Sequence, residues 1–124
     1  MATWTKDELM QIAGADELQL ESRRRDGTLR SPVTMWVVRD GGDLYVRSIH
    51  GRAGSWFRAT RTRHDGHIRS GGVERDVSFT DADPSIGDRV DAAYRSKYHG
   101  YASNVVDTLV NAGARSATIK LVPR

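Results

Sequence analysis

Residues 23–59 are RRRDGTLRSPVTMWVVRDGGDLYVRSIHGRAGSWFRA, and this segment decides the predicted fold. Asp26-Gly27 and the DGGD run at 40–43 are turn sequences that favour two β-hairpins. Val33–Val38 is apolar on both faces, which is typical of a strand that is covered on both sides. The segment then leaves its last strand through Gly51 and Gly54. Small residues, aromatic rings and guanidinium groups therefore occur together at the end of a predicted hairpin.

The flanking sequence predicts further strands and separate helices. Before the segment, a capping box at Thr5 begins a helix that reaches Ala13, and Glu17–Glu21 alternates like a half-buried strand. Pro32 interrupts the strand that begins at Thr28. The further predicted strands are a third one over Leu44–Ile49, two around Gly71-Gly72 of which the second is Val73–Phe79, and a last one over Ala117–Leu121. The further predicted helices are short turns over Ser55–Thr62 and two helices over Asp83–Tyr98 and Ala102–Val110. Antiparallel strands with segregated helices indicate an α+β fold, and about six strands favour a small barrel.

The composition is that of one ordinary globular domain, residues 1–124. The 124-residue chain is 38% hydrophobic and 28% charged. It has no apolar run long enough to cross a membrane and no signal-peptide core at its start, so we expect a cytoplasmic protein. It contains no cysteine, which excludes disulfides, thiolate catalysis and cysteine-ligated zinc. We expect no metal site of another kind, because the histidines lack the spacing of known ligand motifs.

The positive charge is concentrated in one part of the sequence. Residues 1–22 hold five acidic residues and one lysine, whereas residues 23–75 hold twelve arginines and five acidic residues. Arginine binds phosphate and carboxylate through a planar fork of donors. One interpretation is an anion clamp built from Arg25, Arg30, Arg47 and Arg58, side chains of neighbouring strands and the following loop. The other is a solvated basic face, in a sequence that uses arginine in place of lysine throughout.

Several runs of this sequence resemble a known family. RRRDGTLRSPVTMWVV, DLYVRS and SWFRA, together with DAAYRSKY and TIKLVPR, are similar to a family of uncharacterised bacterial proteins classed as a domain of unknown function. More distantly, the layout is similar to the split β-barrel flavin- and deazaflavin-dependent oxidoreductases, including the pyridoxamine phosphate oxidase-like and deazaflavin-dependent nitroreductase groups. The resemblance implies a six-stranded antiparallel split β-barrel with flanking helices. It also implies a homodimer that binds FMN or a deazaflavin in a groove near the dimer interface.

The resemblance also implies site residues. Arginines at 24, 25 and 30 match the basic segment around the glycine, Arg47 and Ser48 match the strand end beside the cofactor phosphate, and Trp56 matches the loop tryptophan. Asp26 is a departure, because the nitroreductases have a small hydroxyl residue there and a carboxylate would repel a phosphate. The complete set of candidate cofactor-binding residues is Arg24, Arg25, Arg30, Arg47, Ser48, Gly51, Gly54, Ser55, Trp56 and Arg58.

Other functions stay open at this point. Trp56, beside glycine and serine, is the better candidate for stacking on a ligand, whereas we expect Trp36 in the core. His50 is either a proton donor beside a bound ring or an exposed turn residue. The leading hypothesis is a small flavin- or deazaflavin-binding protein that acts as an oxidoreductase on a small organic substrate. The alternatives are a non-enzymatic module that binds a small anionic ligand and, less favoured, an RNA-binding protein with a GxxG loop at 51–54. We expect no membrane partner.

Overall fold

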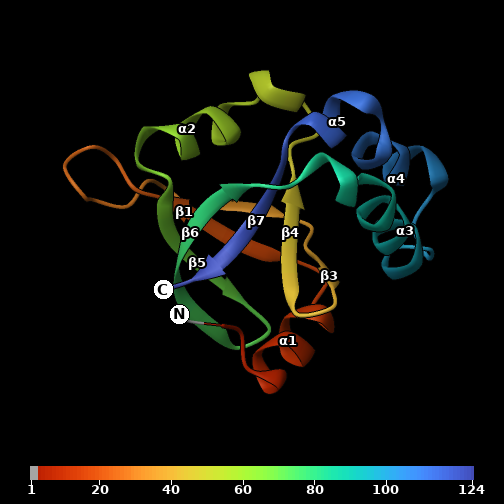
Figure 1. Ribbon diagram of the computed structural model, residues 1–124, viewed down its shortest axis with the longest axis horizontal. Coiled ribbons are helices and arrows are strands. Elements are labelled where there is room, and N and C mark those ends of the chain that lie inside the picture. Colours follow the sequence, from red (N-terminus) through yellow and green to blue (C-terminus); the bar gives the residue numbers. More distant parts are fainter. Residues whose placement is uncertain (1–2) are drawn as a thin grey trace.

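The strands form one antiparallel sheet in the order β2-β1-β5-β6-β7-β4-β3 (Figure 1). The structure is a computed structural model that describes residues 3–124. Its strands are β1 (Leu18–Ser22), β2 (Val33–Met35), β3 (Val38–Asp40), β4 (Asp43–Arg47), β5 (Asp65–Ser70), β6 (Val73–Asp81) and β7 (Thr118–Pro123). The last strand of the sequence, β7, therefore lies near the middle of the sheet and pairs with both β6 and β4.

The helices lie outside this sheet. They are α1 (Lys6–Ala13), α2 (Ser55–Arg63), α3 (Gly87–Lys97), α4 (Ser103–Val110) and α5 (Ala112–Ser116), with 3₁₀ turns η1 (Gly51–Ala53) and η2 (Pro84–Ile86). Figure 1 shows α3, α4 and α5 together on one side of the sheet, with α1 and α2 apart from them. No helix within residues 3–124 has both the length and the apolar character that crossing a membrane requires.

Two residues, Trp36 and Val37, bring the two edges of the sheet together. They join β2, which pairs with β1 at one edge, to β3, which pairs with β4 at the other. Because so short a connection cannot span an open sheet, the sheet must curl until its edges are adjacent. The single strand predicted over Val33–Val38 is therefore two strands, and the sheet has seven strands where the sequence predicted six.

Two apolar clusters lie on the two faces of β4. Leu44 and Val46 point into the curled sheet, where they pack with residues of β1, β5, β6 and β7. Tyr45 points the other way and packs with Val90, Tyr94 and other side chains of α3 and α4. The strand covered on both sides is thus β4, because α3 and α4 lie on its outer face.

The local signals of the sequence are confirmed in most elements. Thr5 Oγ1 accepts from the Glu8 N–H at 3.1 Å and the Glu8 carboxylate accepts from the Thr5 N–H at 2.9 Å, which completes the predicted capping box. The Asp26-Gly27 turn forms, but the strand expected from Thr28 is reduced to one bridge between Arg23 and Leu29. Pro32 lacks the N–H that a continued ladder would need. Gly54, not Ser55, is the N-cap of α2, and α5 was not predicted.

Candidate functional site

A groove runs along the first turns of α2, and it consists of two adjoining cavities that share Val33 and Trp56. The first, which we call the basic cavity, has a volume of about 270 Å³ and is lined by Leu20, Ser22, Arg24, Arg30, Ser31, Val33, Ser55, Trp56 and Ala59. The second, which we call the apolar cavity, has a volume of about 480 Å³ and is lined by Val33, Thr34, Met35, Trp36, Arg47, Ile49, His50, Trp56, Val105, Thr108 and Leu109.

Two arginines give the basic cavity its positive charge. Arg30 is half-buried and its Nε is buried without a hydrogen-bond partner in the described chain. Arg24 Nη1 donates to the Leu29 carbonyl at 2.9 Å. Neither guanidinium has a carboxylate within ion-pair distance among residues 3–124, although most arginines of this protein do. Since a half-buried guanidinium favours an anionic partner, this cavity is suited to a phosphate or carboxylate.

The N-terminus of α2 adds hydrogen-bond donors beside these arginines. Its N-cap, Gly54, has no side chain to accept from the first-turn N–H groups, and Ser55 and Trp56 of that turn line the basic cavity. Free N–H groups and the positive end of the helix dipole both favour an anion. Asp26, the residue expected to repel a phosphate, instead accepts from the Thr28 N–H at 2.9 Å and the Thr28 hydroxyl at 2.6 Å. The hydrogen bonds with Thr28, followed by the charge of Arg24, hold its pKa below the usual range.

The glycine loop shapes the groove from behind. A Cβ at Gly54 would lie 2.4 Å from the Ser48 hydroxyl oxygen, so no larger residue fits there without a shift. Ser48 is buried, and its Oγ has no partner within residues 3–124. Gly51 has a φ of +65°, and a Cβ there would approach the Gly113 carbonyl oxygen to 3.2 Å. These three predicted site residues line neither cavity, and they hold the loop close to its neighbours.

Flat aromatic and aliphatic side chains line the apolar cavity. Trp36 stacks on Tyr98 with ring centres 3.8 Å apart and planes within 3° of parallel. Trp36 is half-buried. It packs against the apolar cluster on the outer face of β4, as the sequence analysis expected of a core residue, and it also lines the cavity. Ile49 and Val105 are 53% and 43% exposed. Such walls are suited to a planar apolar ring.

Arg47 reaches the apolar cavity from the interior, and its charge is already balanced. It is 2% exposed and forms an ion pair with Asp91. Its Nε donates to the Thr118 hydroxyl at 2.9 Å, Nη1 to the Leu109 carbonyl at 2.8 Å and Nη2 to the Gly87 carbonyl at 3.1 Å. Arg47 lies on the face of β4 that α3 and α4 cover, which explains why it is buried.

The predicted four-arginine clamp is not assembled in one cavity. Arg30 lines the basic cavity and Arg47 the apolar cavity, while Arg25 and Arg58 are exposed and line neither. The basic cavity does bring together Arg24, Arg30, Ser55 and Trp56 of the predicted set. His50 is exposed and lines the apolar cavity. Sequence reasoning missed the wall from α4, namely Val105, Thr108 and Leu109, because nothing local in the sequence indicates that α4 packs beside the glycine loop.

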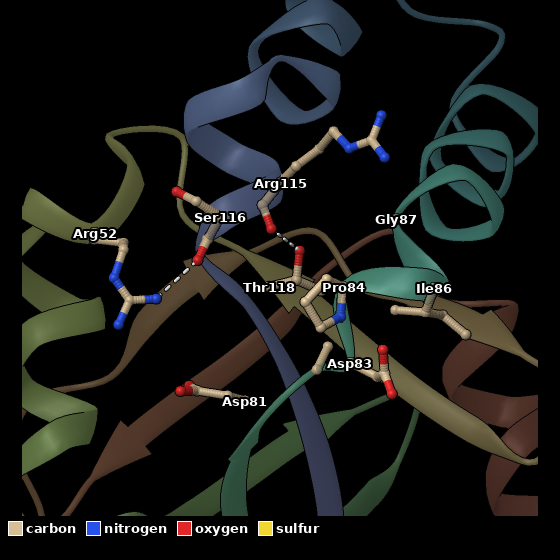
Figure 2. Close-up of a pocket in the computed structure, with 10 residues that line it drawn as sticks. Arg52, Asp81, Asp83, Pro84, Ile86, Gly87, Arg115, Ser116 and Thr118 are labelled. Carbon is tan, nitrogen blue, oxygen red and sulfur yellow. Dashed lines mark hydrogen bonds between the residues drawn. The ribbon is translucent and has the colours of Figure 1, made fainter.

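A larger cavity, of about 610 Å³, lies between η1, α5 and η2 (Figure 2). Figure 2 shows the Arg115 side chain extending toward α3, where it pairs with Asp88 and Asp91. Asp81 pairs with Arg61 at 2.6 Å, and the Asp83 carboxylate caps η2 by accepting from the Ser85 N–H. Arg52, the other arginine of this lining, donates to the Ser116 carbonyl at 2.9 Å. The lining thus has two arginines and two aspartates and no net charge, whereas the basic cavity has two arginines and no carboxylate, which makes the groove the better site for an anion. Residues 3–124 contain no group of three or more side chains placed to hold a metal ion.

The family of the chain follows from its sequence. Residues 8–121 match the model of the family described as "Uncharacterized protein conserved in bacteria (DUF2255)". The chain belongs to this family. The match confirms the resemblance to a bacterial family of unknown function. Among curated proteins no significant match is found for this DUF2255 chain.

Solved structures with the same fold include proteins described as flavin- or F420-related. A conserved hypothetical protein from Mycobacterium tuberculosis superposes with a TM-score of 0.69 at 15% identity, over 98% of this chain and 81% of that one. A putative pyridoxamine 5'-phosphate oxidase from Listeria innocua superposes with a TM-score of 0.65 at 18% identity, over 95% of this chain and 91% of that one. A protein described as an F420 reductase superposes with a TM-score of 0.57 at 17% identity, over 93% of this chain and 90% of that one. These likenesses confirm that this DUF2255 chain has the α+β split-barrel fold.

Proposed function

We propose that the groove binds a flavin or deazaflavin cofactor. The observation that carries this proposal is that the basic cavity and the apolar cavity adjoin at Trp56. Arg24, Arg30 and Ser55 would hold the phosphate, and Trp36 and Trp56 would face the ring. The residues fit such a group, because the buried Arg30 Nε has no partner in the described chain and a phosphate would supply one. The similar structures include proteins described as FAD-binding and as an F420 reductase.

The proposed activity is that of an oxidoreductase acting on a small organic substrate. A bound flavin or deazaflavin supplies the hydride chemistry, and the protein supplies anchoring, orientation and exclusion of water. Trp36, Ile49 and Val105 give the ring site its apolar wall, which lowers the local dielectric constant. His50 lines the same cavity, and we propose it as the proton donor to the bound ring.

Cofactor titration tests the proposal directly. FMN, FAD and a deazaflavin are titrated while tryptophan fluorescence is followed, with riboflavin as the ligand that has the ring but lacks the phosphate. We expect saturable quenching by a phosphorylated cofactor, weaker binding of riboflavin, and about ten-fold weaker FMN binding in Arg30→Gln, since charge-assisted hydrogen bonds each contribute about 1.5–3 kcal/mol. Arg69→Gln is the matched control, because Arg69 is exposed on β5 and lines neither cavity. Absence of saturable quenching with all three cofactors contradicts the proposal.

A second candidate function is binding of a small anion without redox chemistry. The basic cavity favours it, because Arg30 and the uncapped N-terminus of α2 are together sufficient for a phosphate or carboxylate. In this case inorganic phosphate protects the protein against thermal unfolding, the protection is lost in Arg30→Gln, and FMN gives no greater protection than phosphate. Preferential protection by FMN favours the cofactor hypothesis instead.

We further propose that a second copy of the chain covers the exposed side of the apolar cavity. Ile49, Tyr101 and Val105 are 53%, 45% and 43% exposed, and Tyr101 lies against Trp36 with ring centres 4.8 Å apart. Exposed apolar side chains gathered at one place favour an interface. Sedimentation velocity should show a dimer that dissociates in Val105→Glu. A monomer at all concentrations contradicts the homodimer.

A further inference from the structure

Lys97, at the end of α3, is in a different environment from the two other lysines of the chain. Lys6 is exposed on α1, and Lys120 forms an ion pair with Asp43 at 3.5 Å. The Nζ of Lys97 donates to the Val37 carbonyl at 2.6 Å and lies 5.2 Å from the centre of the Tyr98 ring. No carboxylate within residues 3–124 is at ion-pair distance from it. This amine is therefore half-buried without an ion-pair partner in the described chain.

Burial makes the amine of Lys97 easier to deprotonate. Burial lowers its pKa from 10.5 to about 8, and the negative charge of Asp16 opposes this effect. The Tyr98 hydroxyl lies 3.2 Å from the same Val37 carbonyl oxygen, and Arg39 lines the same cavity as Lys97. A neutral amine carries a free lone pair, and this is the reactive form of lysine toward carbonyl carbon.

A cavity beside Lys97 provides space for a small electrophile. Its volume is about 380 Å³, and it lies between the end of α1, β3 and the last turns of α3. Arg39, on β3, lines the same cavity. Its Nε donates to the Gly41 carbonyl at 2.7 Å, and it has no carboxylate partner in the described part of the chain. The remaining guanidinium donors of Arg39 are free to bind a phosphate group.

We propose that Lys97 is an acyl-acceptor site for small acyl phosphates, with Arg39 binding their phosphate group. The lone pair of Nζ attacks the acyl carbon, and the bond from that carbon to the phosphate oxygen breaks. An amide forms, inorganic phosphate leaves, and the proton lost from nitrogen passes to water. No oxidant or reductant is required. The amine of Lys97 lies over the Tyr98 ring, and this ring stacks on Trp36 of the apolar cavity. Acylation removes the positive charge of Lys97 and therefore changes the environment of Tyr98, which contacts the wall of that cavity.

Acetylation with acetyl phosphate tests this site. The protein is incubated at pH 8, and acetylation of Lys6, Lys97 and Lys120 is followed by peptide mass mapping. We expect Lys97 to react at least ten-fold faster than Lys6, because the lowered pKa of Lys97 gives it a much larger fraction of neutral amine at pH 8. The Lys97 rate should rise with pH up to about 8 and then level off. Equal rates at the three lysines overturn the proposal.

Two variants and a second reagent separate phosphate binding from simple reactivity. Arg39→Gln should slow acetylation of Lys97 by acetyl phosphate several-fold but leave its rate with an uncharged N-hydroxysuccinimide ester unchanged. Arg89→Gln, which removes another exposed arginine, should change neither rate. Circular dichroism spectra verify that both variants fold. If Arg39→Gln slows both reagents equally, or slows neither, Arg39 does not bind the phosphate and the proposal is wrong.

Discussion

Arg47 is stably buried because each side of its guanidinium faces an acceptor. Asp91 supplies the opposite charge, and Thr118 Oγ1 with the carbonyls of Leu109 and Gly87 supplies the remaining acceptors. The side chain thereby links β4 and β7 to α3 and α4. A buried charge is tolerated only when it is paired and hydrogen-bonded in this way. Arg47 is thus part of the framework behind the apolar cavity. The charge of Arg30, in the adjoining basic cavity, is the one available to a ligand.

Replacing Arg47 by methionine should strongly destabilise the protein. The substitution leaves the Thr118 hydroxyl and two carbonyls without their donor and leaves Asp91 with Arg115 as its remaining partner. Loss of one member of a buried ion pair costs about 3–5 kcal/mol, so the urea midpoint should fall clearly. Arg89→Met is the control, since Arg89 is 68% exposed in its pair with Asp40 and exposed pairs contribute about 1 kcal/mol or less. Equal losses in the two variants would contradict this account.

Among the elements, α3 holds together the places where the chain changes direction. The Tyr98 hydroxyl donates to the Asp16 carbonyl at 2.6 Å, before β1, and accepts from the Val37 N–H at 3.2 Å, between β2 and β3. Residue 98 directly follows the helix and is fully buried. One hydroxyl therefore fixes both the start of β1 and the crossing that closes the sheet.

Tyr98→Phe should destabilise this junction while leaving the ring in place. The Val37 N–H and the Asp16 carbonyl lose a partner inside the protein, at a cost of about 1–3 kcal/mol for an unsatisfied buried group. We expect a lower urea midpoint and faster hydrogen exchange at the Val37 amide. The matched substitution Tyr101→Phe, at a residue 45% exposed, should change stability by less than about 0.5 kcal/mol. Unchanged exchange at Val37 in Tyr98→Phe would argue against the hydroxyl as the fixing group.

At the scale of the whole molecule, stability should depend on pH through His67 of β5. Its ring lies 2.9 Å from an Asp76 oxygen and 3.2 Å from a Glu74 oxygen, both on β6. Burial alone would lower its pKa, but hydrogen bonds to the two carboxylates outweigh this effect and raise the pKa above 6.5. A raised pKa in the folded state means that the folded protein binds the proton more tightly than the unfolded chain does.

The free energy of unfolding should therefore decrease as the pH rises from about 6.5 toward 8. The contribution of His67 is complete below the unfolded pKa and is lost as the pH passes through the folded one. Urea unfolding between pH 6 and 8 measures this slope, and His67→Gln should flatten it. Lys97, with a pKa of about 8, begins to contribute in the opposite direction as the pH approaches 8. Comparison with His67→Gln removes this contribution, because Lys97 is present in both proteins. An identical slope in His67→Gln would exclude the histidine as its source.

Sequence signals predicted what depends on neighbouring residues and missed what depends on distant ones. The capping box at Thr5, the Asp26-Gly27 turn and the helical turns from Ser55 are local, and each appears where it was expected. The burial of Arg47 depends on α3 and α4, which follow it by 40 residues or more. The division of Val33–Val38 into two strands depends on the curvature of the entire sheet. Neither was visible from the alternation of apolar residues.

The central position of β7 makes the integrity of the sheet depend on the final strand in the sequence. A polypeptide that stops before Thr118 retains β2-β1-β5-β6 and the β4-β3 pair, but each then has an unpaired border where β7 should lie. Such unpaired backbone is a template for aggregation. Interrupted translation or cleavage near this strand would therefore yield a fragment recognisable to proteases and chaperones, not a shortened but working protein.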